Sequence, residues 1–75
     1  MYDQVVDNYL SPLIDKPDEI WYHEDGSIRK EQWYKDGELH REGDKPAKIT
    51  YLSDGSIWEE QWFKDGNHVR TRVIR

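Results

Sequence analysis

Carboxylates are the most numerous side chains in this chain that could take part in catalysis. The sequence has 16 acidic residues, 3 histidines and no cysteine. Four of the aspartates stand directly before a glycine, and aspartate in that position favours a turn through its own backbone contacts. We therefore assign a conformational role to Asp25, Asp36, Asp54 and Asp65.

Two glutamates, Glu31 and Glu60, each precede a tryptophan by two residues. A carboxylate buried in such an apolar setting would have a raised pKa and could serve as a general acid. A position at the rim of the apolar cluster, paired with a nearby cation, explains the same spacing. We favour the paired rim position over the general acid.

Other catalytic and ligand-binding chemistries lack the spacing that they need. The three histidines, His23, His40 and His68, form neither a helical HExxH pattern nor another metal-ligand spacing. The serines have no histidine and acid in the order of a nucleophilic triad. The glycines are dispersed, so there is no phosphate-binding loop. The sequence predicts no catalytic residue, metal or cofactor, and we expect a protein that is not an enzyme.

An internal repeat defines the elements that carry these side chains. A shift of 29 residues aligns residues 17–41 with residues 46–70, and 14 of the 25 aligned positions are identical. Within each copy two Asp-Gly pairs stand 11 residues apart. Asp-Gly favours a two-residue type I′ turn, and the segments between the pairs are rich in β-branched and aromatic residues. The repeat therefore predicts a run of antiparallel hairpins with four tight turns.

We expect one domain over residues 1–75, made of an N-terminal segment (1–16), a first repeat (17–45) and a second repeat (46–75). Apolar residues recur at helical spacing in the N-terminal segment, and Ser11-Pro12 would end a helix near residue 10. The expected fold class is α+β: a twisted antiparallel hairpin sheet of about six strands, with this short helix packed on one face. Alternatively, the segment folds onto a partner. The apolar residues are Tyr2, Val5, Val6, Tyr9, Leu10 and Leu13.

Two-residue turns would fix the pairing of the strands. In the second repeat they predict the pairs Tyr51–Trp58, Trp62–Val69 and Trp58–Val73, with Glu59 opposite Arg72. One face then becomes an apolar core face, with Ile20, Tyr22, Trp33, Ile49, Tyr51, Trp58, Trp62, Val69 and Val73 beside Glu60 and Thr71. The other is mixed, with Trp21, Ile28, Tyr34, Leu39, Leu52, Ile57, Phe63 and Ile74 among Thr50, Glu59, Gln61, His68, Arg70 and Arg72.

The mixed face supplies the candidate partner-binding residues. Aromatic side chains and arginine dominate the energetics of protein interfaces. An equally open interpretation is that the apolar members form a small second cluster under a loop. The candidates are Trp21, Tyr34, Leu52, Ile57, Phe63, Arg70 and Arg72.

The repeat unit resembles a known family. Asp25-Gly26-Ser27, Trp33, Asp36-Gly37, Leu39-His40-Arg41, Pro46-Ala47, Ile49 and Tyr51, and in the second copy Asp54-Gly55-Ser56, Trp62 and Asp65-Gly66, are similar to the degenerate MORN-type repeats of bacterial and phage proteins, including antitoxin-like relatives. The resemblance implies stacked hairpins that bind rather than catalyse. Two stretches depart from the pattern: Asp44-Lys45-Pro46-Ala47 replaces Asp-Gly-Pro-Ala, and Asn67-His68-Val69-Arg70 replaces Leu-His-Arg.

Charge and composition narrow the partner class. The net charge of -5 disfavours affinity for nucleic acid and for anionic lipid, because both need cationic side chains. No apolar run approaches the ~20 residues of a membrane span. The absence of cysteine and of a signal-peptide pattern fits a reducing compartment. We expect a cytoplasmic protein that binds neither membranes nor, directly, nucleic acid.

The expected function is a protein-binding module, acting as a small inhibitor or adaptor of phage or bacterial counter-defence type. One alternative is an acidic mimic of nucleic acid, carried by the acidic N-terminal third, that blocks a nucleic-acid-binding enzyme. Another is a self-associating repeat unit that pairs through residues 67–75, although the arginines there discourage pairing. A stacking platform for single-stranded nucleic acid, on Trp21, Tyr34 and Phe63, is the least favoured because such grooves are basic.

Overall fold

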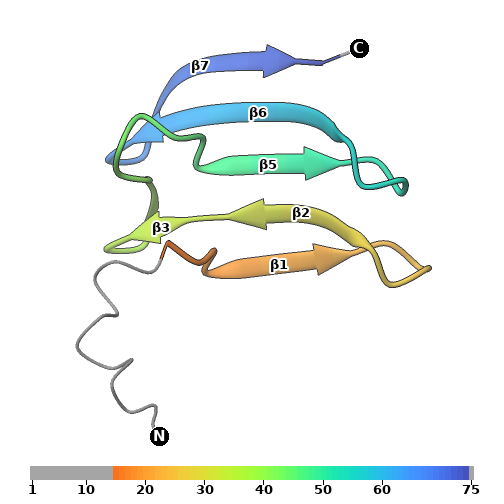
Figure 1. Ribbon diagram of the computed structural model, residues 1–75. Coiled ribbons are helices and arrows are strands. Elements are labelled where there is room, and N and C mark those ends of the chain that lie inside the picture. The colour runs from red at the N-terminus through yellow and green to blue at the C-terminus, as the bar shows by residue number, and fades with distance from the viewer. Residues whose placement is uncertain (1–14, 75) are drawn as a thin grey trace, which may run out of the picture.

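The computed structural model describes residues 15–74, and all regular elements in this range are β-strands (Figure 1). Five of them form one antiparallel sheet, in the spatial order β1, β2, β5, β6, β7. The other two form a separate hairpin. The sheet consists of β1 (Glu19–Tyr22), β2 (Ile28–Gln32), β5 (Lys48–Tyr51), β6 (Ile57–Lys64) and β7 (Asn67–Val73), and the hairpin of β3 (Tyr34–Lys35) and β4 (Glu38–Leu39).

The strand order follows from the repeat. In the first repeat the chain leaves the sheet after β2, forms the β3–β4 hairpin and returns as β5, which pairs with β2 (Figure 1). In the second repeat the chain continues from β6 into β7 without leaving the sheet. Thr50 pairs with Lys30, and Val73 pairs with Glu59, which is the repeat counterpart of Lys30. Strand β7 therefore takes beside β6 the place that β5 takes beside β2.

The four Asp-Gly turns are of two kinds. At Asp36-Gly37 and Asp65-Gly66 both residues have a positive φ, with +53° and +82° in the first pair and +51° and +84° in the second. This is the backbone of a type I′ turn, so the predicted two-residue turn is confirmed at these positions. In the other two pairs only the glycine has a positive φ, and the predicted turn type is wrong there.

The Asp-Gly-Ser loops are one residue longer than predicted. The N–H of Leu52 donates to the carbonyl of Ser56 at 2.8 Å, so three residues connect the strands, and Asp54 Oδ1 accepts from the N–H and the hydroxyl of Ser56. A β-bulge follows, because Tyr51 pairs with Ile57 and the next pair is Thr50 with Glu59. The predicted pair Tyr51–Trp58 is therefore wrong. The first repeat has the same loop and a bulge at the equivalent place.

A second bulge, at Val69, exchanges the two faces of β7. Phe63 pairs with His68, but the next pair is Trp62 with Arg70, so Val69 is an extra residue. Because side chains alternate along a strand, one extra residue moves all later ones to the other face. The predicted pairs Trp62–Val69, Trp58–Val73 and Glu59–Arg72 are wrong for this reason.

The register gives the sheet one aromatic and one polar face. A row of directly paired residues crosses all five strands on the first face: Ile20, Glu31, Ile49, Glu60 and Arg72. Alternation along the strands adds Tyr22, Tyr51, Trp58, Trp62 and Arg70, and we call this side the aromatic face. Two rows define the polar face: Glu19, Gln32, Lys48, Gln61 and Thr71, and Trp21, Lys30, Thr50, Glu59 and Val73.

The predicted α+β class is wrong for the described part of the chain. Residues 15–74 contain no helix, and none of their elements packs on either face of the five-stranded sheet. The tryptophan rings expected under a helix are covered instead by arginine side chains that the Val69 bulge and the loop after β4 bring over them. The segment for which the helix was predicted falls almost wholly within residues 1–14, outside the described range.

The resulting core is small. The buried apolar side chains of residues 15–74 are Trp33, Ala47, Ile49 and Trp62, and none of the larger side chains is completely excluded from solvent. No helix with the length and hydrophobicity of a membrane span occurs in this range. The stability of the fold therefore depends on the turns and on the packing around two tryptophans.

We predict that Gly55→Ala lowers the free energy of unfolding by about 1 to 2 kcal/mol, because Gly55 has a φ of +91° that an L side chain rarely adopts. The new Cβ would meet no atom within 4 Å, so backbone strain alone would cause the loss of stability. Urea denaturation followed by tryptophan fluorescence measures it. Ser53→Ala, in the same exposed loop, should change the value by less than about 0.5 kcal/mol. Equal effects of the two substitutions on the free energy of unfolding would show that the positive φ of Gly55 is not the cause of the loss.

Candidate functional site

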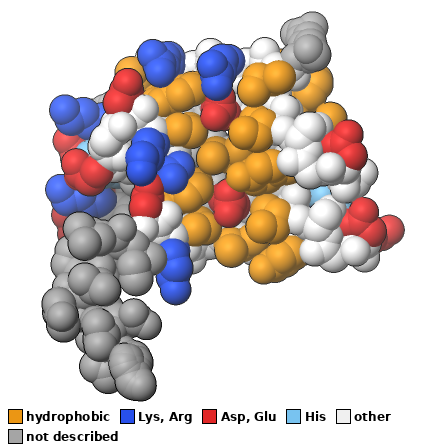
Figure 2. Space-filling model, in the orientation of Figure 1, with side chains coloured by type: hydrophobic (Ala, Val, Ile, Leu, Met, Phe, Trp, Pro, Cys, Tyr) orange, Lys and Arg blue, Asp and Glu red, His pale blue; other side chains and the backbone are white. Residues whose placement is uncertain are grey.

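The aromatic face carries large apolar side chains that are exposed to solvent. Figure 2 shows hydrophobic side chains across the middle of the sheet, interrupted by acidic ones, with basic side chains near the β7 edge. Ile20, Tyr22 and Trp58 on this face are 39%, 57% and 42% exposed. Contiguous apolar surface of this kind marks interaction sites in monomeric proteins.

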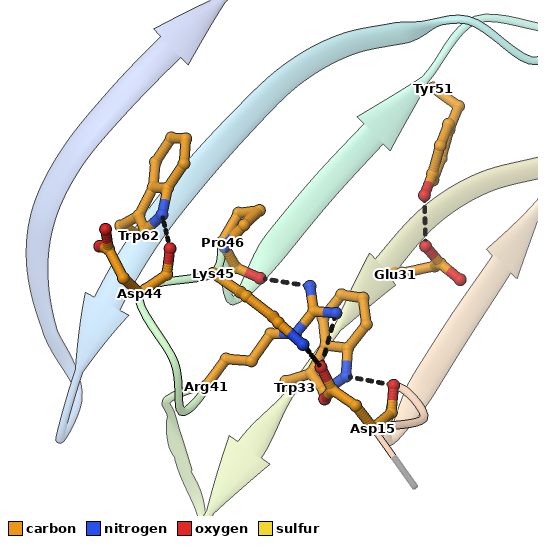
Figure 3. Close-up of polar contacts among 9 residues, drawn as sticks. All are labelled: Asp15, Glu31, Trp33, Arg41, Asp44, Lys45, Pro46, Tyr51 and Trp62. Atoms are coloured by element: carbon orange, nitrogen blue, oxygen red, sulfur yellow. Dashed lines mark hydrogen bonds and ion pairs between the residues drawn. The ribbon is translucent and has the colours of Figure 1, made fainter.

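Both glutamates of this face have a partner. Glu60 is buried and accepts hydrogen bonds from Nε and Nη2 of Arg72 at 2.9 and 2.5 Å. The predicted pairing with a cation is thus confirmed for Glu60, but the predicted rim position is wrong, because Glu60 is buried in the middle row of the face. Glu31 accepts a short hydrogen bond from the Tyr51 hydroxyl instead (Figure 3). Burial, followed by this hydrogen bond, raises the pKa of Tyr51, so the phenol stays protonated and keeps donating.

Each repeat tryptophan is anchored through its indole N–H. Trp33 Nε1 donates to the main-chain carbonyl of Asp15 at 3.4 Å, and Trp62 Nε1 donates to that of Asp44 at 3.1 Å (Figure 3). Asp15 and Asp44 are separated by the same 29 residues as the two tryptophans. A buried indole needs such a partner, so both copies satisfy the same requirement in the same way.

An arginine covers each of these rings. The guanidinium carbon of Arg41 lies 3.6 Å from the centre of the Trp33 ring, and that of Arg70 lies 4.1 Å from the centre of the Trp62 ring. Both distances are within the range of cation–π attraction. Sequence reasoning assigned Arg70 to the opposite face. The occurrence of arginine at the same position of both copies was the available signal for this contact.

The two stacked arginines differ in their partners. Arg41 donates from Nε and Nη2 to Asp15 Oδ2 at 2.9 and 2.8 Å, and from Nη1 to the carbonyl of Pro46 at 3.0 Å (Figure 3). Lys45 reaches the same oxygen of Asp15 at 3.1 Å. Arg70 has no carboxylate within 4.0 Å among residues 15–74. The guanidinium of Arg41 is thus bound to a carboxylate and a carbonyl, whereas that of Arg70 lacks an anionic partner among the described residues.

His40 joins the small hairpin to the second repeat. Its Nδ1 accepts a hydrogen bond from the N–H of Asp65 at 2.9 Å, so the ring proton lies on Nε2, which is 2.6 Å from Glu42 Oε2. The N–H of Gly66 donates to the carbonyl of Leu39 at 2.9 Å. These bonds hold the β3–β4 hairpin against the β6–β7 turn, and His40 therefore has a structural role.

The predicted partner-binding residues do not form one surface. Arg70 and Arg72 come together over Trp62, whereas Trp21 lies on the polar face with Lys30 4.5 Å from the centre of its ring. Tyr34 lies in β3 and donates to Glu19 at 2.8 Å. Leu52 is exposed in the second Asp-Gly-Ser loop, Ile57 begins β6, and Phe63 contacts His68 edge to face at 5.4 Å.

One hollow lies where the β3–β4 hairpin meets the segment before β1. It has a volume of about 610 Å³ and is lined by both signs of charge, including Asp15, Lys35, Arg41 and Glu42. These four are joined in ion pairs, Arg41 with Asp15 and Lys35 with Glu42. Within the described range no three His, Cys, Asp or Glu residues are grouped so that they could hold a metal ion. The hollow therefore gives no specific argument for a small-molecule ligand.

Comparison of the chain with models of protein families, with curated proteins and with solved structures finds no match. The resemblance to MORN-type repeats therefore stays a prediction from the sequence. The function has to be argued from the surface itself.

We predict that Asp15→Asn reduces the dependence of stability on pH below about 4. Hydrogen bonding and charge from Arg41 lower the pKa of Asp15 from its ordinary value of 3.8. A lowered folded pKa means that the stabilisation is present above the ordinary value and is lost as pH falls through the folded one. Urea denaturation of the wild type and the variant between about pH 5 and pH 2 measures the difference.

The matched control is Glu24→Gln, at an exposed acid that has no ion pair within the described range. Its stability curve should run parallel to that of the wild type. A curve for Asp15→Asn that is also parallel to the wild type would show that the clamp on Arg41 does not stabilise the fold.

Proposed function

We propose that this protein is a non-catalytic protein-binding module that docks its partner on the aromatic face of the sheet. The observation that carries the proposal is the exposure of Tyr22 and Trp58 on a face whose centre, Ile49 and Trp62, is buried. Tryptophan and tyrosine contribute most binding energy in protein interfaces, and the surrounding polar groups exclude water from them. On this face the polar groups beside the rings are Arg70, over Trp62, and the Glu60–Arg72 pair in the middle row.

A protein partner fits this face better than a nucleic acid does. Stacking platforms for single strands lie in grooves of positive potential, where cations contact phosphates. The centre of the aromatic face carries Glu31 and Glu60 instead, and the guanidinium of Arg72 is bound to Glu60. A backbone of phosphates crossing the face would meet both carboxylates. An apolar protein surface would meet the exposed rings and leave the two acids with their present partners.

An acidic mimic of nucleic acid has less support. Such a mimic needs an array of carboxylates that is open to the partner. Asp15 is bound by Arg41 and Lys45, Glu42 by Lys35 and His40, and Glu60 by Arg72. Hydrogen bonds from the serine two residues later lower the pKa of Asp25 and of Asp54 within their loops. Many acids in residues 15–74 therefore act within the fold.

We predict that Trp58→Ala weakens binding of the physiological partner by about 30-fold, because truncation of a central aromatic anchor costs about 2 kcal/mol. The partner is first captured with the tagged protein from the cells that produce it. Its affinity for purified wild type and variants is then measured by calorimetry. Trp58 is 42% exposed, so thermal unfolding should show that the variant is folded.

Trp21→Ala is the matched control, since Trp21 has a similar exposure of 37% but lies on the polar face. This variant should keep the affinity of the wild type. Loss of binding in Trp21→Ala and retention in Trp58→Ala would assign the partner to the polar face and refute the proposal. Binding that collapses as salt rises, with no effect of Trp58→Ala, would favour the acidic mimic.

A further inference from the structure

Strand β7 is an open edge of the sheet. All seven of its residues are exposed, and its only neighbour among the described strands is β6. The N–H of Ile74 donates to the carbonyl of Trp58 at 2.9 Å, which directs the backbone groups of every second residue toward β6. By alternation, Thr71 and Val73 direct their N–H and C=O groups to the open side. The edge thus offers a ladder of unpaired backbone groups.

The repeat indicates which kind of strand fits this edge. Strand β5 occupies the equivalent position in the sheet and has antiparallel neighbours on both sides. Strand β7 has the place of β5 but only one of the two neighbours. An antiparallel strand added to β7 would therefore continue the geometry that the sheet already has.

The side chains of β7 define the chemistry of that strand. Arg70 and Arg72 share one face by alternation, and the Val69 bulge makes it the aromatic face. Arg72 is bound to Glu60, while Arg70 lies over Trp62 without a carboxylate in the described part of the chain. The equivalent Arg41 binds a carboxylate of Asp15 with two nitrogens. Arg70 is thus placed to bind a carboxylate as Arg41 does, but that carboxylate has to come from outside residues 15–74.

The other face of β7 is apolar at one position and uncharged at the next. Thr71 and Val73 lie on the polar face, and Val73 is 39% exposed. Residues of an added strand alternate between the two faces. Acidic residues opposite Arg70 and Arg72 would therefore alternate with an apolar or uncharged residue opposite Thr71 and Val73.

The same arginines disfavour a second copy of β7 as the occupant. In an antiparallel pair centred on Thr71, Arg70 of one copy would stand directly opposite Arg72 of the other, and like charges in that position are destabilising. Strand β1 of a second copy offers one carboxylate, that of Glu19, and this carboxylate already accepts a hydrogen bond from the Tyr34 hydroxyl. Neither of the two described edge strands of a second copy therefore complements the β7 edge.

We propose that the open edge of β7 binds an extended segment of another protein in which acidic and apolar residues alternate. The segment adds an antiparallel strand, pairs its backbone with Thr71 and Val73, and places carboxylates on Arg70 and Arg72. This site is separate from the docking of a partner on the aromatic face and does not depend on it. General electrostatic attraction does not explain such binding, because the chain has a net charge of -5.

The test uses a capped synthetic peptide of sequence Thr-Val-Glu-Val-Glu-Val-Thr with a fluorescent label, titrated with the full-length protein. We expect a dissociation constant below about 1 mM by fluorescence anisotropy. The peptide with glutamine at both glutamate positions should bind at least about fivefold more weakly. The variant Arg70→Gln should bind the acidic peptide more weakly than the wild type does, to a similar extent. Arg29→Gln removes an exposed arginine from β2, outside the edge, and should leave the affinity unchanged.

Backbone pairing is tested with two further peptides, which leave the protein unaltered. N-methylation of the central valine, opposite Thr71, removes an amide that faces β7 and should abolish binding. N-methylation of one glutamate removes an amide that faces away from β7 and should preserve binding. Equal loss with both peptides would show that the edge does not form the ladder.

The remaining outcomes also decide the proposal. Absence of binding at about 1 mM protein, or equal affinity of the acidic and amide peptides, would refute it. If sedimentation shows a dimer, and formation of this dimer displaces the peptide, the edge belongs to a second copy of the chain. Trp58→Ala should leave peptide binding intact, so failure of the edge site and failure of the aromatic-face proposal can be told apart.

Discussion

The arrangement of the described chain depends on how each repeat anchors its tryptophan. The indole N–H of Trp33 and of Trp62 is satisfied by a main-chain carbonyl of the segment that precedes its repeat, and a guanidinium covers the ring. The first contact ties each repeat to the chain before it, and the second closes the ring from solvent. With so few buried apolar side chains, these two anchors supply most of the specific packing.

Within residues 15–74 the sheet has no second layer, so the exposure of its apolar side chains has to be limited in another way. Here the long stems of arginine lie on the rings and keep their charged ends in water. Tyr51 and Arg72 satisfy the two glutamates that the repeat places on the same face. Tyr22 and Trp58, which stay exposed, lie at the end of the sheet away from Arg70 and Trp62.

The two repeats have similar sequences, but they differ in the partners of their arginine and in the strand edge that the described chain covers. In the first repeat Arg41 binds Asp15 and the carbonyl of Pro46, and the chain returns as β5 to cover the edge of β2. In the second repeat Arg70 stacks on Trp62 with no carboxylate partner among residues 15–74, and no described strand covers the outer edge of β7. Such an edge is suited to receive one more strand.

Much of this fold was determined by local sequence. Asp-Gly at Asp36 and Asp65 sets a positive φ at two successive residues, and alternation in the segments between the turns places Trp58, Glu60 and Trp62 on one face. Only the tertiary structure decided where the bulges fall, because a bulge depends on hydrogen bonds to a neighbouring strand rather than on the residue that bulges. The one at Val69 moved Arg70 and Arg72 from the predicted mixed face onto Trp62. One extra residue, invisible in the pattern of the strand itself, thus decided which side chains share the candidate site.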